Sequence, residues 1–443
     1  MQLKGCVRRG ERTILSAVLC AFILPAAAQA EEITVRPSDS STATVEDSNI
    51  YKDISGAERG GVFNIASGAS LTFNAAETFL NNSSIVQGGA VYNFGVVNFN
   101  ATAEFDRNAA SYGGGAVFNY NIVNFNASAT FTRNEATADC GGAIYNTAVV
   151  NFNDSANFDG NKAQKQGGAI YNYKKSSKNA ALFFLTDAAF TGNESSSDGG
   201  AVFSYQGLLT FGGTATFDGN QARVGGAIYS DYDTVNFSAD AVFTNNKATY
   251  GNGGAVYFSR GSMTFGGAST FEGNSTENTG GAIYSIRNII NFNDGATFTN
   301  NTATQYGGAV YNGGGEMTFA QSATFTGNKA LTYDGGALHN NGTVNFNAET
   351  IFKENQANDR GGAIYNGGTV NFYEKATFQK NKTIKYTGAA VHNFGTLFFA
   401  KEAVFEENSS SYNSSAIFYN YSGTTTFGGT ATFTRNSGYN QSV

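Results

Sequence analysis

Residues 361–381 read GGAIYNGGTVNFYEKATFQKN, and this stretch decides the fold. It holds three short segments, 363–366, 369–372 and 376–378, in which apolar and polar residues alternate between glycines or polar residues. Alternation with a period of two is typical of β-strands that bury one face. The stretch therefore predicts three strands joined by tight turns.

This stretch is one copy of a repeat. Gly-Gly-Ala followed by an aliphatic residue, an aromatic residue and Asn is clearest at 88–93, 141–146, 167–172 and 361–366. Phe-x-x-Asn recurs with its Phe mostly 26 to 28 residues after the previous one. A fixed period of about 20 to 50 residues indicates a solenoid or propeller, and a propeller blade needs four strands and about 40 residues. The sequence thus predicts an all-β fold, a right-handed parallel β-helix of about 14 coils of about 27 residues.

The parity of each segment indicates which side chains enter the core. Val370 and Phe372 share one face, Ala376 and Phe378 share another, and Asn371 and Thr377 point away. In the first strand we expect the aliphatic residue to point inward and the aromatic residue after it to form an outward column. The predicted column consists of Phe63, Tyr92, Phe118, Tyr145, Tyr171, Phe203, Tyr229, Tyr257, Tyr284, Tyr311, His339, Tyr365, His392 and Phe418. Its tyrosines are candidates for a binding surface, because rows of Tyr stack on sugars or dock peptides, whereas self-stacking or burial under a turn would make the column structural.

The recurrent Gly and Asn residues have expected structural roles. The Gly-Gly pair supplies the backbone freedom for a tight corner. The Asn of Phe-x-x-Asn is expected at another corner, bonded to turn backbone and to the Asn of the next coil. These structural asparagines include Asn108, Asn134, Asn161, Asn193, Asn220, Asn246, Asn274, Asn301, Asn328, Asn355 and Asn381.

Composition limits the chemistry available to the chain. It has 443 residues with 55 Gly and 2 His, 14% charged residues and a net charge of −7. No cofactor or metal motif occurs, and an acidic chain without a basic stripe is not expected to bind nucleic acid. The best candidates for catalysis are Asp231, Asp233, Arg260 and Arg287, at turns of neighbouring coils, where carboxylates beside arginine could serve a carbohydrate-active enzyme. We favour the interpretation that these are solvated turn charges, so the sequence assigns no catalytic residue and predicts a binding protein rather than an enzyme, with a β-helical polysaccharide lyase or glycosidase as the alternative.

The two ends differ from the repeat. Residues 1–30 carry basic residues, an apolar run and Ala28-Gln29-Ala30, the layout of a signal peptide for Sec export. Residues 31–58 are expected to form an N-terminal cap, and 59–443 the repeat domain. No C-terminal cap or barrel pattern follows the repeats, so self-association through an open C-terminal coil is a further expectation. An insertion places Lys174, Lys175 and Lys178 together as a second candidate binding element, or as a tolerated surface loop.

The paired Gly-Gly-Ala-[Ile/Val/Leu] and Phe-x-x-Asn motifs, over about residues 59 to 436, resemble the repeats of the chlamydial polymorphic membrane proteins. That resemblance implies an autotransporter-like passenger at the outer membrane and cell surface, or secreted, acting as an adhesin on a host-cell or matrix protein or glycan.

Overall fold

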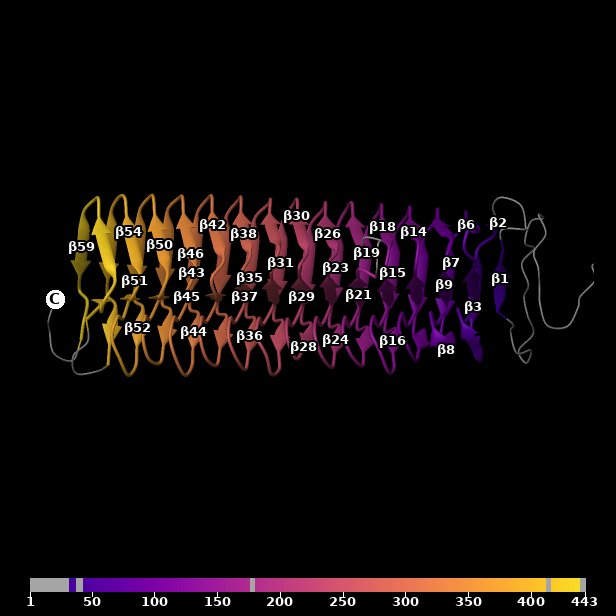
Figure 1. Ribbon diagram of the computed structural model, residues 1–443, viewed down its shortest axis with the longest axis horizontal. Helices are drawn as coiled ribbons and strands as arrows, with labels where there is room; N and C mark the ends of the chain where they lie inside the picture. The colour runs from indigo at the N-terminus through magenta and orange to yellow at the C-terminus, as the bar shows by residue number, and fades with distance from the viewer. Residues whose placement is uncertain (1–31, 37–42, 176–179, 412–415, 439–443) are drawn as a thin grey trace, which may run out of the picture. The chain divides into compact units, whose positions relative to one another are not determined.

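The computed structural model describes residues 32–36, 43–175, 180–411 and 416–438 (Figure 1). The predicted signal peptide and Lys178 lie outside these residues. The chain is an all-β parallel β-solenoid of about 14 turns with about 27 residues in each turn, as predicted, and the described residues form no helix. None of them therefore forms a helix that could cross a membrane. The chain comprises two compact units, residues 1–189 and 190–443.

A full turn contains four strands, here called its first, second, third and fourth strands. Strands of the same kind pair in parallel with those of the neighbouring turns, so each unit contains four sheets. The first strands of unit 1 are β1 (Ile33–Val35), β5 (Phe63–Ile65), β9 (Val91–Asn93), β13 (Val117–Asn119), β17 (Ile144–Asn146) and β21 (Ile170–Tyr173). Those of unit 2 are β25 (Val202–Tyr205), β29 (Ile228–Asp231), β33 (Val256–Ser259), β37 (Ile283–Ile286), β41 (Val310–Asn312), β45 (Leu338–Asn340), β49 (Ile364–Asn366), β53 (Val391–Asn393) and β57 (Phe418–Asn420).

The second strands end on an inward Phe in almost every turn. In unit 1 they are β2 (Ala43–Val45), β6 (Ser70–Phe73), β10 (Val96–Phe99), β14 (Ile122–Phe125), β18 (Val149–Phe152) and β22 (Ala181–Phe184). In unit 2 they are β26 (Leu208–Phe211), β30 (Thr234–Phe237), β34 (Ser262–Phe265), β38 (Ile289–Phe292), β42 (Glu316–Phe319), β46 (Thr343–Phe346), β50 (Thr369–Phe372), β54 (Thr396–Phe399) and β58 (Thr424–Phe427).

The third strands carry the Phe of Phe-x-x-Asn in all turns but the first. In unit 1 they are β3 (Asn49–Lys52), β7 (Glu77–Leu80), β11 (Ala103–Asp106), β15 (Ala129–Thr132) and β19 (Ala156–Asp159). In unit 2 they are β27 (Ala215–Asp218), β31 (Ala241–Thr244), β35 (Ser269–Glu272), β39 (Ala296–Thr299), β43 (Ala323–Thr326), β47 (Thr350–Lys353), β51 (Ala376–Gln379), β55 (Ala403–Glu406) and β59 (Ala431–Thr434). The boundary between the units falls within β23 (Ala188–Thr191).

The fourth strands correct the expectation of three strands per coil. In unit 1 they are β4 (Ala57–Arg59), β8 (Ser83–Gln87), β12 (Ala109–Ala110), β16 (Glu135–Ala136) and β20 (Lys162–Ala163). In unit 2 they are β24 (Glu194–Ser195), β28 (Gln221–Ala222), β32 (Lys247–Ala248), β36 (Ser275–Thr276), β40 (Thr302–Ala303), β44 (Lys329–Ala330), β48 (Gln356–Ala357), β52 (Lys382–Thr383) and β56 (Ser409–Ser410). Most have only two residues, which is too short to show an alternating pattern.

The core of each unit contains two phenylalanine stacks beside its aliphatic residues, as strand parity predicts. In unit 2, Phe298 of β39 stacks on Phe325 of β43 with ring centroids 4.7 Å apart and planes 3° apart. Phe292 of β38 stacks on Phe319 of β42 at 4.5 Å in the same way, and the two stacks meet edge to face. This spacing matches that of neighbouring strands, so each ring covers the ring of the turn before it.

The register corrects the ends of the predicted outward column. Phe63 lies opposite Val91 and Phe418 opposite Val391, so both belong to the inward aliphatic column. Val62 and Ile417 take the position that Ala has in other copies, which shifts the aromatic residue by one. Asn64 and Tyr419 therefore lie in the outward column, next to Tyr92 and His392 respectively.

The segment expected to cap the N-terminus forms strands of its own. Residues 33–35, 43–45 and 49–52 form β1, β2 and β3, which pair with β5, β6 and β7 of the next turn. The inward Val35 and Val45 of this turn are only 3% and 1% exposed.

Candidate binding surface

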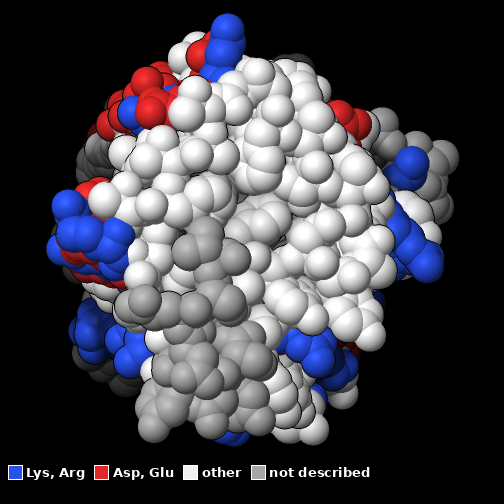
Figure 2. Space-filling view, turned by 90° about the vertical axis from the view of Figure 1, so that its left-hand side faces the viewer, with Lys and Arg blue, Asp and Glu red and all other residues white. Residues whose placement is uncertain are grey.

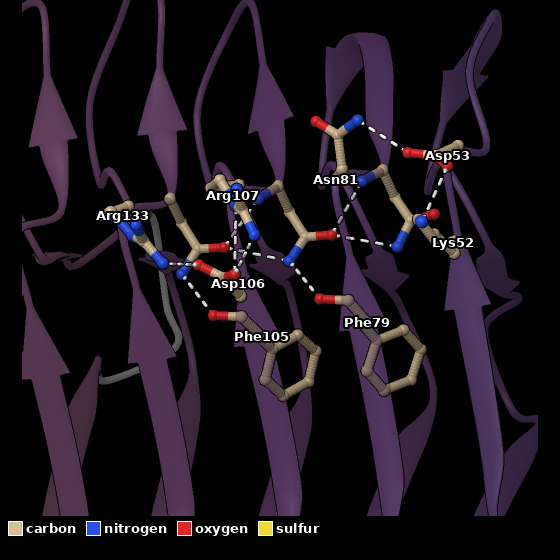
Figure 3. A network of polar contacts seen from close by, with 11 residues as sticks. Lys52, Asp53, Phe79, Asn81, Phe105, Asp106, Arg107 and Arg133 are labelled. Atoms are coloured by element: carbon tan, nitrogen blue, oxygen red, sulfur yellow. Dashed lines mark hydrogen bonds and ion pairs between the residues drawn. The ribbon is translucent and has the colours of Figure 1, made fainter.

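Within each unit a buried asparagine ladder holds the corners after the third strands, except after β3, which has Ile54 at that position (Figure 3). Asn108 is completely buried, and its Oδ1 accepts hydrogen bonds from the backbone N–H and the Nδ2 of Asn82. Its own Nδ2 donates to the carbonyl of Phe79 at 2.9 Å and to Oδ1 of Asn134 at 3.0 Å. The same contacts recur in unit 2, for example from Asn246 through Asn274 to Asn301. Each amide thus satisfies buried backbone groups of an adjacent turn.

A second asparagine ladder lies at the ends of the first strands. The sequence-based interpretation assigned no role to these asparagines. Asn93, Asn119 and Asn146 are completely buried, and each Nδ2 donates to Oδ1 of the next asparagine at 2.8–2.9 Å. The same ladder runs from Asn340 to Asn393 in unit 2. The signal was present in the sequence as the sixth residue of the Gly-Gly-Ala block.

Where serine replaces the asparagine of this ladder, a side chain between the first and second strands of the same solenoid turn takes over the bonding. Ser230 donates to Asp233 Oδ2 at 2.7 Å, and the backbone N–H of Gly207 donates to Oδ1 of the same carboxylate. Ser285 bonds Asn288 in the same manner at 2.7 Å. Asp233 is 2% exposed, and burial raises the pKa of its carboxyl to about 7.

Asp231, Asp233 and Arg260, which were considered for catalysis, make ion-pair and hydrogen-bond contacts that hold neighbouring turns together. Asp231 is 4% exposed and forms a bidentate ion pair with Arg260, with Nη2–Oδ2 and Nε–Oδ1 distances of 2.6 and 3.0 Å. The Arg260 guanidinium also lies 4.1 Å from the centre of the Tyr232 ring. Asp233 belongs to the interrupted ladder, so the two carboxylates are engaged in separate networks.

The predicted outward tyrosines form stacks within each unit. In unit 2, Tyr229, Tyr257, Tyr284 and Tyr311 have ring centroids 4.6–5.1 Å apart and nearly parallel planes. Tyr365 stacks on His339, and burial lowers the pKa of His339 to about 3, so its imidazole is neutral. The faces of the rings contact each other. The parts of the column that a ligand could contact are therefore the ring edges and the hydroxyl groups.

Exposure varies along the tyrosine column. Tyr92 and Tyr171 are buried, whereas the other six candidate tyrosines are half-buried. Burial raises the pKa of Tyr92 and of Tyr284 to about 12, so these hydroxyls are neutral hydrogen-bonding groups. The half-buried set consists of Tyr145, Tyr229, Tyr257, Tyr284, Tyr311 and Tyr365.

Aromatic side chains that are more exposed than the tyrosine column lie in the tight connections between first and second strands of unit 1. Phe94 is 37% exposed and stacks on Tyr120 with centroids 4.3 Å apart. Lys175 from the insertion lies over the Tyr120 ring at 5.2 Å, and its Nζ is 3.4 Å from the Tyr120 hydroxyl. Phe94, Tyr120 and Lys175 are called the turn cluster below. The sequence-based interpretation named Lys174 and Lys175 as candidates, and it did not name the aromatic residues directly after the ladder asparagines.

The chain matches the family model of the Chlamydia polymorphic membrane protein repeat. The matches cover residues 78–93, 128–147, 155–173, 214–231, 240–259, 268–286, 295–313, 322–341 and 349–367. Each runs from a third strand through the fourth strand to the next first strand, and so includes one asparagine of the buried corner ladder. No curated protein and no solved structure matches the chain. These nine segments, all between residues 78 and 367, are therefore repeats of the Chlamydia polymorphic membrane protein type.

Proposed function

We propose that this chain is a surface-displayed or secreted passenger-like protein of a bacterium, which binds a host-cell or matrix protein or glycan without turnover. The observation that carries the proposal is the repeat itself, which matches the polymorphic membrane protein model nine times. That family is one of surface proteins, so the repeat supports a location at the outer membrane or cell surface. A β-solenoid suits this role because every turn adds exposed strand faces and turns to a shared core.

Export through the Sec pathway belongs to the same proposal. The basic, apolar and small-residue regions of segment 1–30 support cleavage after Ala30. Mass spectrometry of the exported chain should then find Glu31 at the N-terminus. An exported protein that retains residues 1–30 would contradict this assignment.

The turn cluster is the region of unit 1 best suited to contact a ligand. Phe94 is exposed at its edge, and Tyr120 and Lys175 bring a phenol and an ammonium group into the same place. Aromatic and cationic side chains together favour sugar, carboxylate or peptide ligands. None of the three is part of the phenylalanine stacks, so they can be replaced without opening the core.

Binding of the purified chain to host cells and to a glycan array tests the proposal. We expect saturable binding that falls at least tenfold in the variant Phe94→Ser/Tyr120→Ser/Lys175→Ala. Ile85→Ser is the matched control, because Ile85 is 57% exposed and lies on β8 of the same unit. Absence of binding to any cell type or glycan would overturn the adhesin function, and equal binding by the triple variant would place the ligand elsewhere.

A further inference from the structure

Four consecutive turns of unit 2 depart from the repeat where the first strand ends. Their first strands, β25, β29, β33 and β37, have four residues, whereas β41 and β45 have three. The third residue of each longer strand aligns with the ladder asparagine Asn312, but none of the four is Asn. The residues at this position are Ser204, Ser230, Phe258 and Ser285. The second asparagine ladder is therefore interrupted over these turns.

The corner after each of these strands holds a large residue in the left-handed backbone conformation. This conformation is costly for a residue with a long side chain, and it recurs at sites where function requires the geometry. In the next turn Gly314 stands at the equivalent corner, with φ of +108°. The large residues and their φ angles are Gln206 (+53°), Tyr232 (+59°), Arg260 (+51°) and Arg287 (+53°). Four turns in succession thus accept backbone strain to place a large polar side chain here.

Arg260 is held in place by two residues of the preceding turn. Besides its bidentate ion pair with the buried Asp231, its Nη1 donates to the Tyr232 hydroxyl at 2.7 Å, and its guanidinium lies over the Tyr232 ring. The Arg260 side chain is nevertheless 45% exposed, and Tyr232 is 47% exposed. A guanidinium has five N–H groups, and these contacts use three of them. One N–H on each Nη therefore remains for a ligand, on a side chain that is already positioned.

Arg287 occupies the same corner one turn later. The backbone N–H of Arg260 donates to the carbonyl of Ile286 at 3.2 Å, so the two arginines begin about one strand spacing apart. Ile286 stands at the position that Asp231 has two turns earlier, so it supplies no carboxylate to Arg287. Arg287 is exposed, and the only ion pair that the two arginines form within the described part of the chain is that of Arg260 with Asp231.

Other cations of unit 2 lie beside acidic side chains. Figure 2 looks onto the last described turns of the unit, and Lys and Arg on the left of the view lie beside Asp and Glu. Arg435, for example, is paired with Glu407. Like charges opposite each other in neighbouring strands are unfavourable. Tyr232, Arg260 and Arg287, called the arginine corner below, therefore favour a bound anion.

The strands beneath the arginine corner favour a sugar over a peptide as the carrier of that anion. Peptides that bind a β-sheet commonly add a strand at an open edge. β29, β33 and β37 are each paired on both sides, so the corner has no such edge. It offers side chains alone: two guanidinium groups suited to a carboxylate or sulfate, and a phenol whose ring and hydroxyl suit a sugar.

We propose that the arginine corner binds an acidic sugar unit of a glycan, with the carboxylate or sulfate group between the guanidinium groups of Arg260 and Arg287. The two remaining N–H groups of Arg260 donate to the anion, Arg287 approaches it from the next turn, and the sugar ring lies against Tyr232. Asp231 is a positioning residue, because it holds Arg260 and does not contact the ligand. The inference rests on the proposed function, for which it names a ligand class and a second site, in unit 2.

Isothermal titration calorimetry of the purified chain with three tetrasaccharides tests the proposal. The probes are a hyaluronan tetrasaccharide, which carries carboxylates, a sulfated cellotetraose, which carries sulfates, and unmodified cellotetraose, which is neutral. We expect one or both acidic probes to bind, with an affinity that falls as salt is added, and the stronger of them to identify the anion. Binding of cellotetraose as tight as that of the acidic probes would overturn the proposal.

Arg287→Gln should weaken binding of the acidic probe by about tenfold or more, because it removes a charge-assisted contact. Arg287→Lys, which keeps the charge, should retain part of the affinity. Arg223→Gln is the matched control, because Arg223 is also an exposed arginine of unit 2 and its guanidinium lies over a tyrosine ring, that of Tyr250, at 5.0 Å. The control should bind like the parent chain, and all variants should keep the same circular dichroism spectrum.

Three results would overturn the assignment: no binding of either acidic probe, unchanged affinity of Arg287→Gln, or an equal loss in Arg223→Gln. The binding assay on host cells separates this outcome from failure of the proposed function. A chain that binds cells but neither acidic probe would refute the arginine corner and leave the proposed function in place. Failure to bind any cell type or any glycan would refute both.

Discussion

Asn274 shows what a single ladder residue contributes. Its Oδ1 accepts hydrogen bonds from the backbone N–H and the Nδ2 of Asn246, and its Nδ2 donates to the Phe243 carbonyl. All of these groups are buried, and a buried group left without a partner costs about 1–3 kcal/mol. The ladder therefore stabilises the turns through satisfied polar groups as well as through apolar contact.

We expect Asn274→Ala to lower the free energy of unfolding by about 3 kcal/mol, because several buried donors and acceptors lose their partner. Urea denaturation followed by circular dichroism measures the change. Asn293→Ala is the control, since Asn293 is exposed in a neighbouring turn of unit 2. Equal effects of the two substitutions would contradict the role of the ladder.

Asp233 makes stability depend on pH. The folded-state pKa of about 7 lies above the ordinary value of 3.8, because burial outweighs the hydrogen bonds from Gly207 and Ser230. Between these two values the folded state retains a proton that the unfolded chain has released. Stability should therefore fall as pH rises through this window, by up to about 1.4 kcal/mol per pH unit for one group.

The variant Asp233→Asn tests this effect, since Asn288 occupies the equivalent position two turns later. We expect the variant to melt at a higher temperature than the parent chain above pH 7 and to show a shallower decline between pH 4 and 7. Glu277→Gln, at an exposed position of the same unit, should leave the profile unchanged. Parallel profiles for parent and Asp233→Asn would show that this carboxyl does not govern the slope.

At the scale of the element, the corner before most first strands is formed by a pair of glycines. Gly307 has φ of +62° at the corner before β41, and a Cβ on the next residue, Gly308, would lie 2.0 Å from the carbonyl oxygen of Gly336. Gly336 is the equivalent residue in the next turn. The close approach of Gly308 to Gly336 therefore leaves no room for a side chain at this corner, whereas Ala389 holds the equivalent position three turns later.

Replacement of Gly308 by Ala should lower stability by about 3 kcal/mol, because the backbone of the next turn must move away. Gly295→Ala is the control, since the nearest atoms to its added Cβ are 4.0 Å away, and its effect should stay within about 0.5 kcal/mol. Thermal melts of both variants measure the difference. A tolerated Gly308→Ala would mean that neighbouring corners can separate without loss of pairing.

At the scale of the whole molecule, each turn pairs with its neighbours through equivalent residues. Asn274 aligns with Asn301 in the corner ladder, and β36 aligns with β40. Removal of residues 274–300 would join Gly273 to Asn301 and restore Phe-x-x-Asn at the junction. The energetics of a solenoid are nearly those of a chain of neighbouring units, so such a change alters length without altering the repeat.

We expect the chain lacking residues 274–300 to fold with unchanged β content and a slightly lower melting temperature. A chain lacking only residues 274–287 should not, because that junction places β38 where a fourth strand belongs. Circular dichroism and limited proteolysis distinguish the two. Unfolding of the full-turn deletion would show that the turns are not interchangeable.

The sequence by itself determined the period, the solenoid and the inward columns of Val, Ala and Phe. These features follow from alternation within strands of three or four residues, such as β50 and β51, and from the recurrence of that pattern along the chain. The resemblance to the polymorphic membrane protein repeats could be identified from the sequence for the same reason, since each of its two motifs consists of consecutive residues.

Only the tertiary structure decided the rest. The fourth strands are too short to carry a pattern, and the second asparagine ladder acquires its role only when Asn93 lies over Asn119. Asp233 replaces an absent ladder amide because the neighbouring turn brings Gly207 to its carboxylate, and Phe94 meets Tyr120 across two turns. Each of these features depends on which residue of the neighbouring solenoid turn lies beside the side chain in question. Backbone pairing between turns decides this, because it holds residues far apart in the sequence at the distance between adjacent strands.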